Sequence, residues 1–186
     1  MNPMAVVQRM TADEYLAQPY EGVRSQLVDG EVIVQGPTNL HQLVLKDVFR
    51  ALDAWAATPG RGTVSWPLDI RLDERNVFGP DLMWYADGRA PGRRDDRPYP
   101  LPDLVVEARS PSTWRYDIGA KKSAYERAGL GELWLVDTAA DEILVFRRAS
   151  RRSTSFDIAL ELGSGDELRS PLLPAFALDV AALFAG

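Results

Sequence analysis

The sequence predicts an α/β fold (α+β layered) in which a mixed β-sheet is flanked by helices. Segments that alternate apolar and polar residues are interspersed along the chain with segments of helical spacing, which favours a layered sheet over a bundle or sandwich. The almost wholly apolar run at residues 104–108 is typical of a strand buried on both faces. The length of 186 residues fits one domain, residues 1–186, with a sizeable core.

The N-terminal part, residues 10–35, is expected to form a short helix and a β-hairpin. A Thr-x-x-Glu capping box at residues 11–14 marks the start of the helix. An Asp-Gly pair at residues 29–30 lies between two apolar stretches and predicts the hairpin turn. Residues 38–57 have apolar side chains at helical spacing and end before a Pro-Gly pair, so they predict a long amphipathic helix.

The central part, residues 38–148, continues from this helix into strands. Residues 63–72 and 77–85 are each predicted to be one strand, and the second contains Asp81. Residues 86–102 are rich in Gly, Pro, Asp and Arg and predict a long loop. A loop of this length is expected to be functional or mobile.

The second half of the chain supplies the remaining layers. The strand at residues 104–108 is followed by a Ser/Pro/Thr turn and a helix at residues 117–128, which a glycine ends. Residues 132–137 and 142–148 predict two more strands joined by a turn. The C-terminal part, residues 155–186, adds a strand and a final helix.

The composition excludes several classes of protein. No apolar run reaches the ~20 residues that cross a bilayer, and the first residues lack the pattern of a signal peptide. The chain has no cysteine, so thiolate sites and disulfides are excluded. We therefore expect a cytoplasmic protein with no membrane partner. The net charge of -6 argues against a broad, nonspecific nucleic-acid-binding surface, although a local basic groove stays compatible with it.

Two acids and a lysine form the main candidate site. Asp81 and Glu107 lie within or at the end of apolar strands, where a charge is rare unless it is paired or bound to a metal. Lys121 follows on a helix face shared with Asp117 and Tyr125, because residues four apart stack along a helix. Two carboxylates suit Mg²⁺ (or Mn²⁺) as metal ligands, and the lysine would stabilise charge developing on phosphorus.

Each of these three residues is also compatible with a simpler role. Asp81 would be an acid at the end of a strand, and Glu107 would pair with Arg109 or Arg115. Lys121 would form an i,i+4 ion pair with Asp117. The two carboxylates would also suit an acid and a base acting on sugars, although that reaction leaves the lysine without a role.

Several stretches of the chain carry longer motifs. They are GPDLMWY at 79–85, PDLVVEARSPST at 102–113, YDIGAKKSAYERAGLGELWLVD at 116–137, QLVDGEVIVQGP at 26–37 and LRSPLLPAFALDVAALF at 168–184. Together these motifs resemble the Uma-two family of restriction endonucleases, which belongs to the PD-(D/E)XK nuclease superfamily. The resemblance covers nearly the whole chain. It implies a restriction-endonuclease-like PD-(D/E)XK core within the layered fold.

The resemblance also implies roles for individual residues. Asp81 matches the Pro-Asp acid and Glu107 the second acid, so both would be metal ligands, while Lys121 matches the lysine that this family places on the helix. The superfamily's usual lysine two residues after the second acid is Arg109 here, which would contact phosphate or pair with Glu107. Gln26 stands where the family often has glutamate, and the neutral amide in place of this acid would weaken metal binding.

Further residues are expected around this site. His41, the only histidine, matches a histidine that is common in the family, and it would hydrogen-bond a carboxylate or phosphate. Glu31 is a candidate accessory acid. Asp117 is expected to be the N-cap of its helix rather than a ligand, and Tyr125 to pack with its hydroxyl near the site. Trp114 lies in a polar turn and is a candidate for base contact.

The residues and the resemblance together predict a Mg²⁺-dependent DNA endonuclease that hydrolyses phosphodiester bonds with a metal-activated water. A homodimer would let two sites cut two strands, and twofold pairs are the commonest oligomers. The alternative is a catalytically weak or inactive nucleic-acid-binding or interaction protein on a nuclease-like fold, because a fold does not determine a function.

Overall fold

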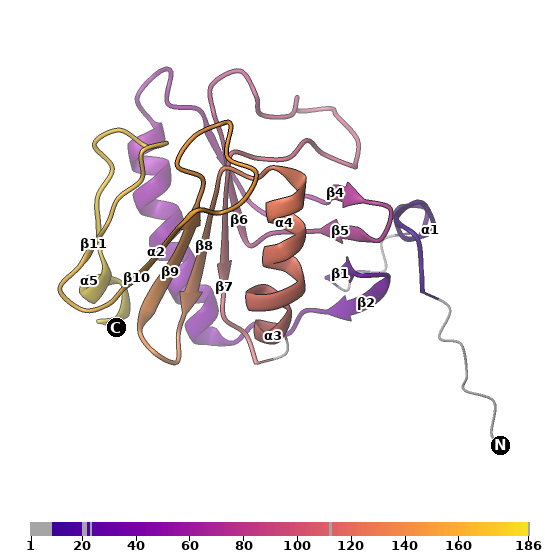
Figure 1. Cartoon of the computed structure of the whole chain (residues 1–186), viewed down its shortest axis with the longest axis horizontal. Coiled ribbons are helices and arrows are strands. Elements are labelled where there is room, and N and C mark those ends of the chain that lie inside the picture. Colours follow the sequence, from indigo (N-terminus) through magenta and orange to yellow (C-terminus); the bar gives the residue numbers. More distant parts are fainter. Residues whose placement is uncertain (1–8, 20–21, 23, 112, 186) are drawn as a thin grey trace.

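A mixed β-sheet of six strands forms the centre of the computed structural model, which describes residues 9–19, 22, 24–111 and 113–185 (Figure 1). Within these residues the strand order is β10-β9-β8-β7-β6-β3. β7 and β8 are parallel, and the other neighbouring strands are antiparallel, so the predicted mixed sheet is confirmed. The strands are Thr63–Ser65 (β3), Leu82–Tyr85 (β6), Leu104–Ala108 (β7), Glu132–Asp137 (β8), Glu142–Arg147 (β9) and Ile158–Leu162 (β10).

A smaller antiparallel sheet of four described strands lies next to α1, at the end of the molecule away from α5 (Figure 1). Its order is β2-β1-β5-β4, and the predicted hairpin forms β1 and β2. The predicted capping box is present at the start of α1. The bounds are Ala12–Leu16 (α1), Ser25–Val28 (β1), Glu31–Val34 (β2), Ile70–Asp73 (β4) and Asn76–Phe78 (β5).

Helices cover both faces of the large sheet. α2 (Asn39–Ala56) lies on one face, as the amphipathic pattern predicts, and α5 (Val180–Phe184) packs beside it. The opposite face carries a continuous helical segment made of α3 (Trp114–Tyr116), the π-helix η1 (Asp117–Lys121) and α4 (Lys122–Ala128) (Figure 1). Two short strands, β11 (Glu167–Leu168) and β12 (Leu178–Asp179), precede α5.

The central strand β7 is buried on both faces because each face packs against helices. Leu104 and Val106 belong to the apolar cluster on the α2 side, whereas Val105 belongs to the cluster that includes residues of α4. Successive side chains of a strand point to opposite faces, so Glu107 shares the α4 side with Val105. The alternation of β7 therefore directs this carboxylate toward the helix that carries Lys121.

Two segments predicted to be single strands are each divided between the two sheets. Residues 63–72 form β3 and β4, with Pro67 between them, where a proline cannot supply a ladder hydrogen bond. Residues 77–85 form β5 and β6, separated by Gly79 and Pro80. Asp81 therefore lies between the sheets, immediately before β6, and the expectation that it lies mid-strand is wrong.

Two predicted helix starts also differ from the structure. The helix expected at 117–128 begins earlier, at Trp114, so the expected N-cap role of Asp117 is wrong. The last helix, expected from the sequence at 178–184, begins at Val180. Asp179 is its N-cap, because the Asp179 side chain accepts bonds from two main-chain N–H groups of the first turn. The predicted loop at 86–102 is confirmed, since it contains no helix or strand apart from one isolated bridge at Tyr99.

Candidate active site

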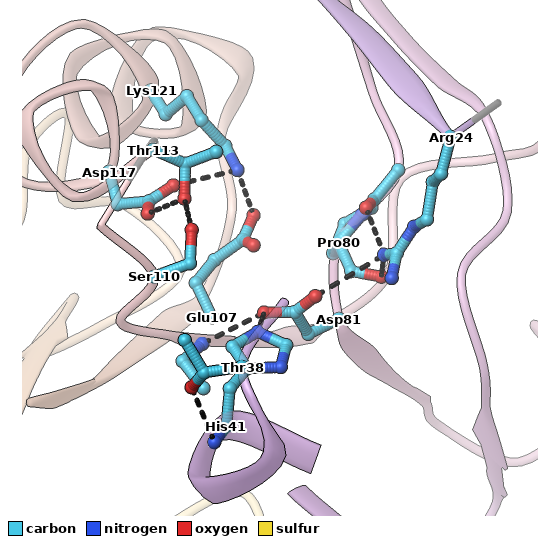
Figure 2. Close-up of polar contacts among 12 residues, drawn as sticks. Arg24, Thr38, His41, Pro80, Asp81, Glu107, Ser110, Thr113, Asp117 and Lys121 are labelled. Carbon is cyan, nitrogen blue, oxygen red and sulfur yellow. Dashed lines mark hydrogen bonds and ion pairs between the residues drawn. The ribbon is translucent and has the colours of Figure 1, made fainter. Parts of the chain in front are cut away.

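Asp81 is buried where the two sheets meet, and donors from three other segments hold its carboxylate. Its Oδ2 atom lies 3.1 Å from His41 Nε2 of α2 and accepts a hydrogen bond of 2.9 Å from the main-chain N–H of Ala108 in β7. Its Oδ1 atom accepts from Arg24 Nη2 at 3.3 Å (Figure 2). Contacts of these kinds orient a carboxylate before any ligand binds.

The surroundings of Asp81 favour its charged form. Burial alone raises the pKa of this carboxyl, but the hydrogen bond and charge of His41, the Arg24 guanidinium and the Ala108 amide outweigh burial and hold the pKa below its ordinary value. Asp81 is therefore an anion at neutral pH, although only 4% of the residue is exposed.

Glu107 lies near the end of β7 and contacts two side chains of the helical segment. Its Oε1 atom accepts a hydrogen bond of 2.7 Å from the hydroxyl of Tyr125 and lies 2.7 Å from Nζ of Lys121. Burial raises the pKa of Glu107 to about 7, the charge of Lys121 opposes this rise, and the charges of Asp117 and Asp81 add to it. The anion at this position is thus destabilised by burial and by neighbouring acids.

Lys121 is a fully buried ammonium group between two carboxylates. Its Nζ atom forms ion pairs with Glu107 Oε1 at 2.7 Å and with Asp117 Oδ1 at 2.9 Å (Figure 2). Burial lowers the pKa of Lys121, but the charges of Asp117 and Glu107 outweigh burial and raise it above its ordinary value. The side chain can therefore supply positive charge and hydrogen-bond donors, and it is not poised to act as a base.

The π-helix η1 carries Asp117 and Lys121 at its two ends. Asp117 is buried and accepts a second bond from Thr113 Oγ1 at 3.0 Å, and Thr113 in turn contacts the Ser110 hydroxyl at 2.8 Å. Single π-helical turns inside α-helices occur frequently at functional sites. The predicted grouping of Asp117, Lys121 and Tyr125 around one site is thus observed, although the local helix is not a regular α-helix.

Arg109 does not contact Glu107, and the alternative in which Glu107 pairs with Arg109 or Arg115 is wrong. Arg109 Nη1 donates to both carboxylate oxygens of Asp137 at 2.9 Å each, and its guanidinium lies 5.2 Å from the ring centre of Trp114. Arg115 instead donates to the neighbouring hydroxyl of Tyr116. Trp114 is therefore partly covered by Arg109 at the rim of the site.

Two residues of the predicted hairpin have no hydrogen bond or ion pair with Asp81, Glu107 or Lys121 among the described residues; these three are called the acid–lysine cluster below. Glu31 is exposed on β2, and its one recorded side-chain contact within the described residues is a weak bond of 3.5 Å from the hydroxyl of Tyr116. Gln26 is 2% exposed, and its Oε1 atom has no hydrogen-bond partner in the described part of the chain. The structure thus does not bring Glu31 into contact with Asp81 or Glu107.

Sequence reasoning missed Arg24 and the main-chain N–H of Ala108. Arg24 is 57 positions from Asp81 in sequence and carries no motif of its own, so no local pattern could identify the contact. The contact between the Ala108 N–H and Asp81 depends on the pairing of β7 with β6, which only the structure shows.

The two carboxylates fit the ligand requirements of a hard divalent cation. Mg²⁺ usually takes one or two protein carboxylates and completes its shell with water and substrate phosphate. The charge of Asp81 is close enough to Glu107 to raise the pKa of the Glu107 carboxyl. Among the residues that the structure describes, no group of three His, Cys, Asp or Glu side chains converges as a metal-binding cluster.

The mixed sheet, the helices on both faces and the buried acid–lysine cluster define a protein of the restriction-endonuclease-like fold. A family model described as "Putative restriction endonuclease" matches residues 12–181, and the chain therefore belongs to the Uma2 family. The family and the fold together support a nuclease as the class of function.

A solved structure confirms the fold over almost the whole chain. The crystal structure of "a putative nuclease belonging to DUF820 from Anabaena variabilis ATCC 29413" is similar with a TM-score of 0.79 and 16% sequence identity, covering 94% of this chain and 97% of that chain. Among curated proteins, no relative matches the chain. In the described part of the chain, no helix has the length and apolar character needed to cross a bilayer.

Proposed function

We propose that this protein is a divalent-cation-dependent DNA endonuclease that hydrolyses phosphodiester bonds. The observation that supports the proposal most directly is the buried arrangement of Asp81, Glu107 and Lys121 on a nuclease-type fold. Two acids and one ammonium group at one buried place match the requirements of phosphoryl chemistry, in which negative charge has to be held and stabilised.

Asp81 and Glu107 would hold Mg²⁺ or Mn²⁺, and such an ion polarises a phosphoryl oxygen and activates a bound water. Lys121 would stabilise the negative charge that develops on the phosphate, because its ammonium group lies in a water-poor site where charge interactions are strong. Asp117 and Tyr125 are positioning residues in this mechanism, since Asp117 holds Lys121 and the Tyr125 hydroxyl holds Glu107.

His41 and the main chain of Ala108 position the other half of the site. Both contact the Oδ2 atom of Asp81. The other carboxylate oxygen, Oδ1, contacts Arg24 alone among the described residues. The Asp81 carboxylate is thereby held in one orientation without its full capacity as an acceptor being used. We also propose a homodimer, in which each protomer would cut one strand.

Cleavage of DNA with and without added metal tests this function. We expect the wild-type protein to cut plasmid DNA with Mg²⁺ or Mn²⁺ and to lose this activity in EDTA. Asp81→Asn should abolish cleavage, whereas Asp53→Asn, the same change at an exposed position of α2, should have no effect. Cleavage that persists in EDTA or in Asp81→Asn would contradict the proposal. Light scattering of the protein in solution tests the dimer.

A second candidate function is a nucleic-acid-binding or interaction protein without turnover. The ion pairs of the site favour it, because each proposed metal ligand already has a cationic partner. Arg24 contacts Asp81, and Lys121 contacts Glu107. The neutral Gln26, at a position where the family resemblance implies glutamate, supports the same function. Retention of DNA without cleavage under any divalent cation would establish this alternative.

A further inference from the structure

A groove of about 1080 Å³ opens beside Asp81, on the side of the smaller sheet. Its walls come from α1, from the hairpin of β1 and β2, from the segment between β3 and β4, and from the end of the loop at 86–102. The lining includes Tyr15, Arg24, Val32, Val34, Leu68 and Tyr99. Sites that bury a drug-sized ligand range from about 300 to 1,000 Å³, so this groove has room for more than one nucleotide.

Arg24 connects the groove to the candidate active site. It lines the groove, and in Figure 2 it reaches Asp81 from the side opposite to Lys121. One nitrogen, Nη2, makes all of its recorded contacts, with the carbonyl oxygens of Gly79 at 2.9 Å and Pro80 at 3.4 Å and with Asp81 Oδ1 at 3.3 Å. Nε and Nη1 have no hydrogen-bond partner among the described residues, so the guanidinium is held in place with donors left over.

The position of Arg24 suits the capture of an anion. Its side chain is 34% exposed, in contrast to the 4% of Asp81 beside it. At 3.3 Å its contact with Asp81 is also longer than the contacts made by His41 and by the Ala108 N–H. A partly exposed guanidinium with unused donors is a group that proteins commonly use to bind phosphate.

The other charged side chains of the groove do not compete for this role. Arg97 pairs with Asp69 at 2.9 Å and donates to the carbonyl oxygens of Leu16 and Gln18, so its charge and both of its terminal nitrogens are already engaged. Asp96 is an exposed acid of the lining and opposes anion binding at its own end. Arg24 differs from Arg97 because one of its terminal nitrogens has no partner in the described part of the chain, and because it contacts Asp81.

We propose that Arg24 binds a backbone phosphate of the nucleic-acid strand and directs the adjoining nucleotides into this groove. The inference rests on the proposed function, because it places the strand relative to Asp81. Phosphate contacts of this kind set the register of a strand without reading its sequence. The partly apolar lining, which includes the exposed Val34 and the half-buried Tyr99, provides surface against which a sugar or base can pack.

Salt-dependent binding tests the role of Arg24. The affinity of a fluorescein-labelled 20-nucleotide single strand and of the matching duplex is measured by anisotropy in Ca²⁺ over a series of salt concentrations. We expect Arg24→Ala to weaken binding about tenfold and to reduce the slope of log K against log salt by about 0.7 for the single strand or 0.9 for the duplex, the loss of one phosphate contact. Arg24→Lys, which keeps one positive charge, should retain most of the slope.

Arg50→Ala is the matched control, since Arg50 is 71% exposed on α2 and its one recorded ion pair is with Asp47. It should leave affinity and slope unchanged. Circular dichroism confirms that each variant is folded, and Arg24→Lys provides the test if Arg24→Ala does not fold. An unchanged salt slope in Arg24→Ala would overturn the role of Arg24. A folded Arg24→Lys that loses the slope of one whole phosphate contact, although it keeps the positive charge, would also overturn it.

Charge placed in the groove itself tests where the strand lies. Val34→Glu adds an acid to the lining and should weaken binding, whereas Leu160→Glu on the exposed edge strand β10 should not. Equal affinities for these two variants would overturn the groove as the binding site.

The proposed function can fail independently of this inference. If the wild-type protein binds DNA but does not cut it with any divalent metal, the nuclease proposal is overturned and the Arg24 measurements stay meaningful. Wild-type protein that cuts DNA while Arg24→Ala keeps its affinity and slope would overturn the inference alone.

Discussion

Lys121 Nζ lies 2.7 Å from Oε1 of Glu107, and each side chain is only 2% exposed. The ion pair is therefore almost completely withdrawn from water, where breaking it by removing one partner leaves an uncompensated buried charge. The same Nζ atom also pairs with Asp117, so a single ammonium group compensates two buried carboxylates. This relationship links the stability of the fold to the candidate active site.

Removal of the ammonium group is expected to destabilise the protein as well as to stop turnover. Lys121→Met should lower the free energy of unfolding by about 3–5 kcal/mol, because Glu107 and Asp117 lose their common partner. Urea denaturation measures the change. Lys46→Met, at an exposed position of α2, is the matched control and should change stability by less than about 0.5 kcal/mol. A loss equal to that of the control would show that the buried ion pairs contribute nothing.

Loss of the His41 contact is expected to weaken metal binding. His41 Nε2 lies 3.1 Å from Asp81 Oδ2 and orients the proposed ligand. Groups that orient metal ligands typically contribute about 10–100-fold in affinity, so His41→Ala should raise the dissociation constant for Mn²⁺ by about this factor. Titration followed by electron paramagnetic resonance measures it without any need for activity. Mn²⁺ affinity equal to that of wild type would remove His41 from the site.

A buried acid outside the site is expected to make stability depend on pH. Glu132 is 1% exposed and accepts bonds of 2.7 Å from Trp134 Nε1 and from the Ser170 hydroxyl. Burial raises the pKa of Glu132, and the hydrogen bonds to Ser170 and Trp134 and the charge of Arg147 offset only part of this rise. The stability that depends on its protonated form is therefore complete below the unfolded pKa and is lost as pH rises through the folded pKa.

Comparison with Glu132→Gln isolates this effect, since glutamine keeps the shape and cannot ionise. As pH rises from the unfolded to the folded pKa of Glu132, the unfolding free energy of wild type should fall relative to that of Glu132→Gln. The expected fall is about 1.4 kcal/mol for each pH unit in this range. Urea denaturation from pH 4 to pH 8 measures it, and Glu161→Gln on the exposed edge of β10 controls for the loss of one acid. A difference that does not change with pH would contradict the prediction.

The predictions of individual elements succeeded where the signal is local. The capping box of α1, the Asp-Gly hairpin and the amphipathic pattern of α2 depend on residues within a few turns of each other, and each is present in the structure. The divided strands failed for the complementary reason. Residues 77–85 have the pattern of one strand, which continues across Gly79 and Pro80. This pattern does not show that β5 and β6 belong to different sheets.

The partner of Arg109 was also beyond local patterns. Arg109 is two positions from Glu107, yet it pairs with Asp137 of the neighbouring strand β8. The choice depends on the parallel pairing of β7 with β8, which brings the ends of the two strands together. The ion pair of Lys121 with Asp117 is different, because its i,i+4 spacing predicted it and the structure confirms it, although the turn between them is π-helical.

The sequence by itself determined the layered fold class, the family resemblance and the identity of the acid–lysine cluster, because these depend on composition, on periodicity and on motifs within short stretches. Only the tertiary structure decided that His41 and Arg24 contact Asp81 and that Glu31 lies apart from both acids. The physical reason is distance. A hydrogen bond requires atoms placed to within a few tenths of an ångström, and contacts between residues 40 and 57 positions apart reach that precision only when two sheets and a helix have packed together.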